Sequence, residues 1–269
     1  AIPIENPVGT APSFIVEHEE KCIICLPGVP REMKYLLNHS VSTYLKKKYS
    51  SVDFIKTRVL HTVGSGESVI DSQIGHLELM TNPVVGLNAH QGQVDVRITA
   101  TGSSEEEVDS LILDTENDVR FNLGDIIFGV DGQRLASVVL RKLKDFDYTV
   151  SVVECGTSAQ LTSKIADADN LMGTFHVGML LNKSFYNKDI ETTLKAMVDY
   201  CSNYSQSDFV IASIVHSDNR NINIGIQLWQ SYDGSTTTKI RGYGGHIEYA
   251  GEWAASIGLD LLRLAVNVN

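Results

Sequence analysis

The 269-residue chain contains no apolar run approaching the roughly 20 residues that a helix needs to span a bilayer. Its first residues, AIPIENP, lack the charged start and apolar centre of a signal peptide. Its four cysteines are too few for a disulfide framework in a chain of this length. These absences predict a protein of the reducing cytoplasm with no membrane partner.

Positive charge is also scarce. The 22 lysines and arginines stand against 33 aspartates and glutamates, which gives a formal net charge of −11. Such a field repels the phosphates of nucleic acids, so a nucleic-acid partner would need a local basic patch. The only basic run, KKK at residues 46–48, is more typical of a solvated helix end. We therefore expect no nucleic-acid partner.

Patterns typical of metal sites are weak. Cys22 and Cys25 form a CxxC, which indicates either redox or metal chemistry or simply two buried residues. Their apolar surroundings predict a strand, on which residues three apart point to opposite faces, so we favour two buried strand residues. His216 and His246 have no acidic or cysteine partner at ligand spacing. We expect no metal and no cofactor.

Residues 1–50 predict a β-hairpin (13–17 and 21–26), a turn at Pro27 and Gly28, and a helix that begins near Pro30. Two strands and one helix cannot bury a core of useful size by themselves. We therefore expect this segment to be the closing part of a larger nucleotide-binding-type α/β domain whose beginning this chain lacks.

Two further parts follow. Residues 51–130 predict a compact α+β module in which a Gly-Ser-Gly-Glu-Ser segment opens a helix. Residues 131–269 alternate helices and strands, which is typical of an α/β sandwich. The chain as a whole is therefore predicted to be of the α/β class.

Three regions, in the same order, resemble the CinA family of competence-damage-inducible proteins. NPVGTAP (6–12) and LPGVPREMK (26–34) resemble the end of that family's first domain, which is related to the MoaB/MogA fold. The GSGES helix start and NPVVGLNAHQGQVDVRITA (82–100) resemble its KH-like module. Residues from about 133 to 264 resemble its C-terminal amidase domain in element order.

The resemblance implies two activities. The first is hydrolysis of ADP-ribose-type pyrophosphates by the first domain, which in the full-length protein would use residues upstream of Ala1. Asn6, Gly9, Pro27 and Gly28 match the surviving part of that domain. They are either a substrate-lining loop, where glycine permits close approach to a phosphate, or ordinary turn residues.

The second implied activity is conversion of nicotinamide mononucleotide to nicotinic acid mononucleotide and ammonia. The family motif, Glu-Ser-Cys-Thr-Gly-Gly before a helix, corresponds here to a segment in which Glu154 and Thr157 match. Cys155 stands in place of the nucleophilic serine, and Ser158 and Ala159 replace the glycines. Cys155 is therefore either a nucleophile, its thiol made more acidic by the helix start, or an inert buried cysteine.

The remaining amidase motifs have also changed. The lysine of the second motif falls on Asn187, so Lys188 or Lys183 would have to act as the base. VHSDN (215–219) replaces a glycine-containing loop, although Gly225 still matches a glycine in the next strand. Gly245-His246-Ile247 replaces a motif whose arginine would clamp a phosphate.

Two hypotheses remain. We favour a CinA-like protein whose C-terminal domain is catalytically degenerate and has a structural, binding or oligomerisation role. The alternative is a divergent amidase with Cys155 as nucleophile, Thr157 assisting and Lys188 or Lys183 as base. A pyridine or ADP-ribose-type nucleotide is the expected small-molecule partner, and a homo-oligomer is the expected assembly.

Overall fold

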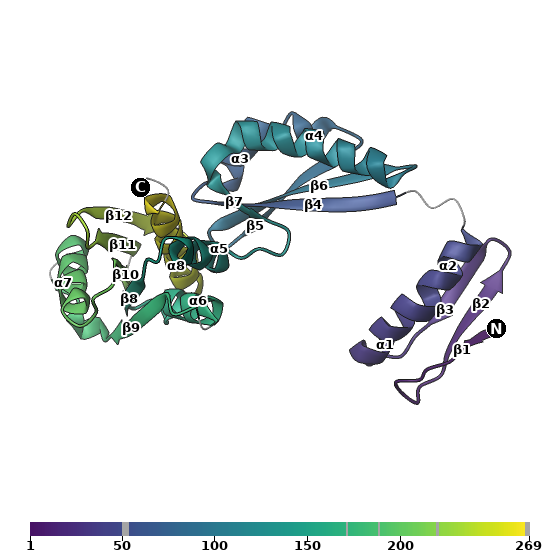
Figure 1. Cartoon of the computed structure of the whole chain (residues 1–269), viewed down its shortest axis with the longest axis horizontal. Helices are drawn as coiled ribbons and strands as arrows, with labels where there is room; N and C mark the ends of the chain where they lie inside the picture. Colours follow the sequence, from purple (N-terminus) through teal and green to yellow (C-terminus); the bar gives the residue numbers. More distant parts are fainter. Residues whose placement is uncertain (50–53, 171, 188, 219–220, 267–269) are drawn as a thin grey trace. The chain divides into compact units, whose positions relative to one another are not determined.

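A computed structural model describes residues 1–49, 54–170, 172–187, 189–218 and 221–266 (Figure 1). The chain divides into two compact units, one formed by Ala1–Phe54 with Gly102–Glu105 and the other by Ile55–Thr101 with Glu106–Asn269. The predicted α/β class is confirmed, because the strands form three separate sheets and helices alternate with them along the chain. The domain boundaries drawn from the sequence, at 50/51 and 130/131, stay a prediction. In the described part of the chain, no helix has both the length and the apolar character needed to cross a membrane.

The first unit is an antiparallel sheet with a helical segment along one face (Figure 1). Its strands are β1 (Ile2–Ile4), β2 (Ser13–His18) and β3 (Lys21–Cys25), so the predicted hairpin is confirmed. The helical segment runs through α1 (Pro30–Leu36), the π-helical turn η1 (Leu37–Val41) and α2 (Ser42–Lys48). Within this unit Ile15 and Leu36 are buried, whereas Phe14, Val16 and Ile23 on the sheet remain exposed.

The CxxC cysteines lie in β3, as expected, but they are only half-buried. Cys22 and Cys25 are both free thiols. The expectation of two buried residues was wrong for a simple reason. A strand buries both of its faces only where both sides of the sheet are covered, and this sheet carries helices along one side.

The middle module has a four-stranded sheet in the order β5-β6-β4-β7. The strands are β4 (Phe54–Val63), β5 (Val84–His90), β6 (Gln93–Gly102) and β7 (Ile127–Val130). The helices α3 (Glu67–Ile74) and α4 (Glu105–Leu123) lie on the same side of it (Figure 1). The 3-10 turns η2 (Leu77–Leu79) and η3 (Gly124–Ile126) follow these helices. One hydrophobic cluster, which includes Leu60, Ile70 and Ile98, joins helices and sheet.

The C-terminal domain has a five-stranded mixed sheet in the order β12-β11-β10-β8-β9. The strands are β8 (Val150–Cys155), β9 (Phe175–Leu181), β10 (Phe209–Ser217), β11 (Ile222–Gln230) and β12 (Thr236–Tyr243). Strand β8 runs parallel to both of its neighbours, while β11 is antiparallel to β10 and β12. Every residue of β8 is buried, including the polar Ser151 and the charged Glu154, as expected for a strand covered on both faces.

Helices cover both faces of this sheet. One hydrophobic cluster joins α5 (Leu135–Asp145), α6 (Gln160–Asp169) and α8 (Ile247–Ala265) to one face. A second cluster joins α7 (Ile190–Ser202) to the other face. The short 3-10 turn η4 (Lys183–Phe185) follows β9. The result is the three-layer α/β sandwich that the alternation of elements predicted.

Two glycines let helices approach closely. A Cβ on Gly225 in β11 would lie 2.4 Å from a methyl carbon of Ile190 in α7. A Cβ on Gly251 in α8 would lie 2.2 Å from the carbonyl oxygen of Thr157, in the loop between β8 and α6. The backbone at Thr157 cannot move aside as a flexible side chain can. The lack of a side chain at Gly251 therefore determines how closely α8 packs against that loop.

We predict that Gly251→Ala destabilises the protein by about 1–3 kcal/mol through overpacking against the Thr157 carbonyl. Gly258→Ala in the same helix is the matched control. Its nearest contact would be the end of the Leu161 side chain at 3.1 Å, which can move, and alanine favours a helix by about 1 kcal/mol. Urea unfolding of the two variants should therefore separate them, and equal midpoints would contradict the prediction.

Candidate functional site

The candidate site begins at the carboxyl end of β8, where the chain turns into α6. In open α/β sheets, ligands bind outside the carboxyl ends of the strands. Strand β8 is an interior strand and runs parallel to β10, so the residues that follow both strands meet at this edge. Glu154 and Cys155 end β8 and Thr157 lies in the turn, so three of the predicted site residues are close together, and Thr157 is hydrogen-bonded to Glu154.

Glu154 organises this turn. Only 1 % of its surface is exposed, and its carboxylate accepts three hydrogen bonds. Thr157 Oγ1 donates to Oε1 at 2.6 Å, the Leu161 amide donates to Oε1 at 3.1 Å, and the Thr162 amide donates to Oε2 at 2.8 Å. The first turn of a helix has amides without intrahelical acceptors, and here a buried carboxylate takes two of them. Glu154 and Thr157 therefore hold the loop in shape.

The turn has a left-handed backbone that suits glycine, although Ser158 and Ala159 stand where the amidase motif has glycines. Gly156, Ser158 and Ala159 all have positive φ, at 73°, 56° and 60°. For residues with a Cβ this left-handed conformation costs about 1–2 kcal/mol each. At Gly156 no substitute fits, because a Cβ would lie 2.3 Å from the Val215 carbonyl oxygen.

Cys155 lies behind a small cavity. Its side chain is 2 % exposed, and Sγ donates to the Asn182 carbonyl oxygen at 3.6 Å. Burial raises the pKa of the thiol, and the nearby Lys183 ammonium only partly offsets this effect. The cavity in front of it has a volume of about 160 Å³. Its other lining residues come from the segments after β9 and from β10, namely Lys183, Tyr186, Ile214, Val215, His216 and Ser217.

The cavity contains two residues that sequence reasoning had not assigned to this site. The rings of Tyr186 and His216 are stacked at 3.8 Å between centroids. His216 lies in the VHSDN segment, but as a single residue it had been considered only as a metal ligand. Its place near the carboxyl end of β10, beside β8, is the signal that could have assigned it here. Of the two candidate bases, Lys183 lines the cavity, whereas Lys188 lies outside the described residues.

Gly225 lies in β11 and faces α7, where it makes room for Ile190 and Leu194. This place gives it a packing role. Its assignment to substrate binding stays a prediction.

The remaining predicted residues belong to the first unit. Asn6 donates to the Ala11 carbonyl oxygen at 3.1 Å and to Glu32 Oε2 at 2.7 Å, which ties the NPVGTAP loop to α1. A Cβ on Gly9 would overlap the Glu32 carboxylate. Pro27 is buried and Gly28 is exposed. These contacts describe a well-packed turn, and its substrate-binding role stays a prediction.

No metal centre emerges from the described ranges, where no group of three or more histidine, cysteine, aspartate or glutamate side chains is arranged to hold an ion.

The chain is similar to known proteins along most of its length. The family model described as the damage-inducible protein CinA KH domain matches residues 57–129. A putative competence-damage inducible protein of Clostridium botulinum (strain 657 / Type Ba4) is 33 % identical over 267 residues, covering 98 % of this chain and 61 % of that protein. One from Halothermothrix orenii is 34 % identical over 180 residues, covering 67 % of this chain and 43 % of that protein. The chain thus spans less than two thirds of the curated relatives it matches.

Among solved structures, a CinA-superfamily protein from Klebsiella pneumoniae 700603 aligns with 49 % of this chain and 96 % of its own, at 12 % identity and a TM-score of 0.44. A competence or damage-inducible protein from Enterobacter asburiae aligns with 50 % of this chain at 15 % identity and a TM-score of 0.43.

We predict that Glu154→Ala destabilises the protein by about 3 kcal/mol or more, because two buried amides and a hydroxyl lose a charged acceptor. Glu154→Gln keeps an acceptor oxygen and should cost about half as much. The control is Glu248→Ala, an exposed glutamate in the first turn of α8, which should cost less than about 1 kcal/mol. Chemical denaturation measures all three, and a Glu154→Ala variant as stable as the control would show that the network contributes little.

We also predict that Ser158→Gly and Ala159→Gly each stabilise the protein by about 0.5–1 kcal/mol. Relief of the left-handed strain exceeds the conformational entropy that glycine loses on folding. Ala166→Gly, in the middle of α6, is the control and should instead destabilise by about 1 kcal/mol. Thermal melting of the three variants provides the comparison, and a loss of stability in all of them would mean that the turn is not strained.

Proposed function

Because the chain belongs to the CinA family of competence-damage-inducible proteins, we propose that its C-terminal domain is a degenerate nicotinamide-nucleotide amidase domain with a structural, binding or oligomerisation role. The observation that carries this proposal is the size of the space in front of Cys155. The cavity of about 160 Å³ is well below the roughly 300–1,000 Å³ of pockets that enclose small-molecule ligands.

The state of the Cys155 thiol supports the same proposal. A cysteine attacks as the thiolate and needs a base or a cation to favour that form. Here burial raises the pKa of the thiol, and Sγ donates to the Asn182 carbonyl, an interaction that favours the protonated form. The buried site thus stabilises the form of Cys155 that does not attack.

The departures from the amidase motif at this turn support it too. The Leu161 and Thr162 amides donate to Glu154, a residue that the motif shares, so this contact does not separate the two functions. The difference lies at Ser158 and Ala159, which stand where the motif has glycines and whose side chains crowd a phosphate that approaches the helix start.

The second candidate function is a divergent amidase that hydrolyses nicotinamide mononucleotide. The observation in its favour is Lys183. This lysine lines the cavity with Cys155, and its Cε would lie 3.8 Å from a Cβ on Gly156. Lys183 could therefore serve as the base that the family motif takes from another position, with Thr157 assisting through the loop.

Pyrophosphatase activity of the whole protein is a separate proposal. Such an enzyme needs several carboxylates around a divalent metal. In the first unit, helix α1 contributes Glu32, which is already hydrogen-bonded to Asn6. The Asn6–Glu32 contact therefore supports at most a positioning role in that reaction.

The two functions of the C-terminal domain are separated by ammonia release from nicotinamide mononucleotide. We expect no release above a protein-free blank from neutral to alkaline pH, and no difference between the wild type and Cys155→Ala, Cys155→Ser or Lys183→Ala. The protein is used intact, and each variant is checked for an unchanged melting temperature.

Turnover that Cys155→Ala abolishes would overturn the proposal and establish the amidase. Its rate should then rise with pH to above the ordinary pKa of a thiol, because burial raises the pKa of Cys155. Turnover that persists in Cys155→Ala and is lost in Lys183→Ala would instead point to a lysine-dependent reaction, and this too would contradict degeneracy.

A further inference from the structure

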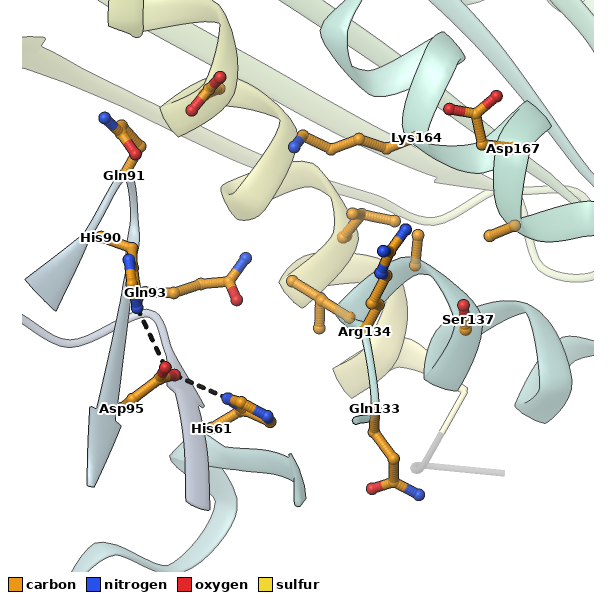
Figure 2. A pocket seen from close by; sticks show the side chains of 15 residues that line it. His61, His90, Gln91, Gln93, Asp95, Gln133, Arg134, Ser137, Lys164 and Asp167 are labelled. Atoms are coloured by element: carbon orange, nitrogen blue, oxygen red, sulfur yellow. Dashed lines mark hydrogen bonds and ion pairs between the residues drawn. The ribbon is translucent and has the colours of Figure 1, made fainter. Parts of the chain in front are cut away.

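A second and larger cavity lies away from Cys155, between the four-stranded sheet and helices α5, α6 and α8 (Figure 2). Its volume is about 510 Å³, within the range of pockets that enclose small molecules. One wall carries His61, His90 and Asp95 from β4, β5 and β6. The opposite wall carries Arg134 at the start of α5 and Lys164 on α6.

The first wall is a histidine–aspartate–histidine cluster. His61 Nδ1 lies 2.7 Å from Asp95 Oδ1, and His90 Nε2 lies 3.0 Å from Asp95 Oδ2 (Figure 2). His61 Nε2 lies 2.5 Å from the Asp131 carbonyl oxygen. Both ring nitrogens of His61 thus face acceptors, and only the doubly protonated imidazolium can donate to both. Burial alone would lower the pKa of His61, but the hydrogen bonds to Asp95 and Asp131 raise it overall.

This cluster limits the repulsion that Asp95 would exert on an anion. Each of its carboxylate oxygens is engaged by a histidine, one of which is held as a cation by its geometry. A carboxylate neutralised in this way contributes little negative potential to the cavity. The first wall is therefore compatible with an anionic ligand although it contains an aspartate.

The second wall carries two cations without partners. Within the described portion of the chain, Arg134 and Lys164 make no hydrogen bond or ion pair through their side chains. Figure 2 shows Lys164 extending from α6 toward the turn between β5 and β6, which carries Gln91. In a chain of net charge −11, two cations that face a cavity without an ion pair are positioned for an external anion, although Asp167 and Glu252 share the lining.

The start of α5 adds backbone donors at the same place. Arg134 is its N-cap residue and supplies no side-chain hydrogen bond to the helix. Ala136 and Ser137, in the first turn, line the cavity. Amides there have no intrahelical acceptor and favour a phosphate group, and a guanidinium offers the paired donors that phosphate oxygens accept.

The rest of the lining suits hydroxyl groups. Asp167 and Glu252 provide acceptors, while Gln91 and Gln93 provide both donors and acceptors. We propose that this cavity binds a small phosphate monoester with a hydroxyl-rich body, the phosphate between Arg134, Lys164 and the start of α5. A sugar phosphate and a nucleoside monophosphate share this chemistry. The site is distinct from the Cys155 cavity and does not depend on the proposed function.

Calorimetric titration of the intact chain tests this proposal with ribose 5-phosphate, adenosine 5′-monophosphate, inorganic phosphate and ribose. We expect both phosphate monoesters to bind, inorganic phosphate to bind more weakly and ribose to show no binding. The tighter of the two monoesters identifies whether the body is a sugar alone or a nucleoside. Arg134→Gln and Lys164→Gln should each weaken binding about tenfold or more, because each removes a charge-assisted contact.

The control variants are Arg141→Gln, an exposed arginine on the same helix, and Lys195→Gln, an exposed lysine on α7. Both should bind like the wild type. Arg134 is exposed and Lys164 half-buried, and neither is paired, so their replacement should leave the melting temperature unchanged. Absence of binding by both monoesters would overturn the proposal. Equal losses of binding affinity in the two test variants and the two control variants would also overturn it, since they would indicate only an effect of the protein's overall charge.

Discussion

The buried carboxylate of Glu154 is the interaction on which the candidate site depends. It closes the turn between β8 and α6 through Thr157 and through two amides of the first turn of α6. A buried charge is tolerated only when hydrogen bonds replace its lost hydration, and three donors do so here. With this turn fixed, the Thr157 carbonyl is held where Gly251 lets α8 pack against it. Thus one carboxylate fixes the conformation of the loop, the start of α6 and the position at which α8 packs against the loop.

The same interaction distinguishes the two helix starts that face cavities. At α6 the amides are taken by Glu154, so an external anion would have to displace an internal one. At α5 no side chain caps the first turn, and Arg134 adds a cation beside it. A helix dipole attracts an anion only where its terminal amides are free. The two amides at the start of α6 are therefore engaged within the chain, whereas the start of α5 is the one at which we propose that an external anion binds.

Much of the fold could be predicted from local patterns. The hairpin of β2 and β3 and the helix start at Pro30 were both recognised, since each depends on residues close together in sequence. The left-handed Ser158 and Ala159 could not be predicted, because neither residue prefers that conformation and the surrounding contacts impose it. The half-buried state of Cys22 and Cys25 depends on what covers the sheet, which no local pattern records.

Neither cavity could be assembled from the sequence. Cys155, Lys183 and His216 are brought together by parallel strands, and only knowledge of the strand order places them side by side. Arg134 and Lys164 had no distinguishing motif at all. What singles them out is a three-dimensional property: among the residues that the structure describes, neither side chain has a carboxylate partner, although the protein is acidic. In an acidic chain, a cationic side chain that can move freely is expected to form an ion pair with a nearby carboxylate. Arg134 and Lys164 line the same cavity as Asp167 and Glu252 but form no ion pair with them, so we attribute their separation to the placement of α5 and α6. The helix packing, and not the local sequence, creates the charge arrangement.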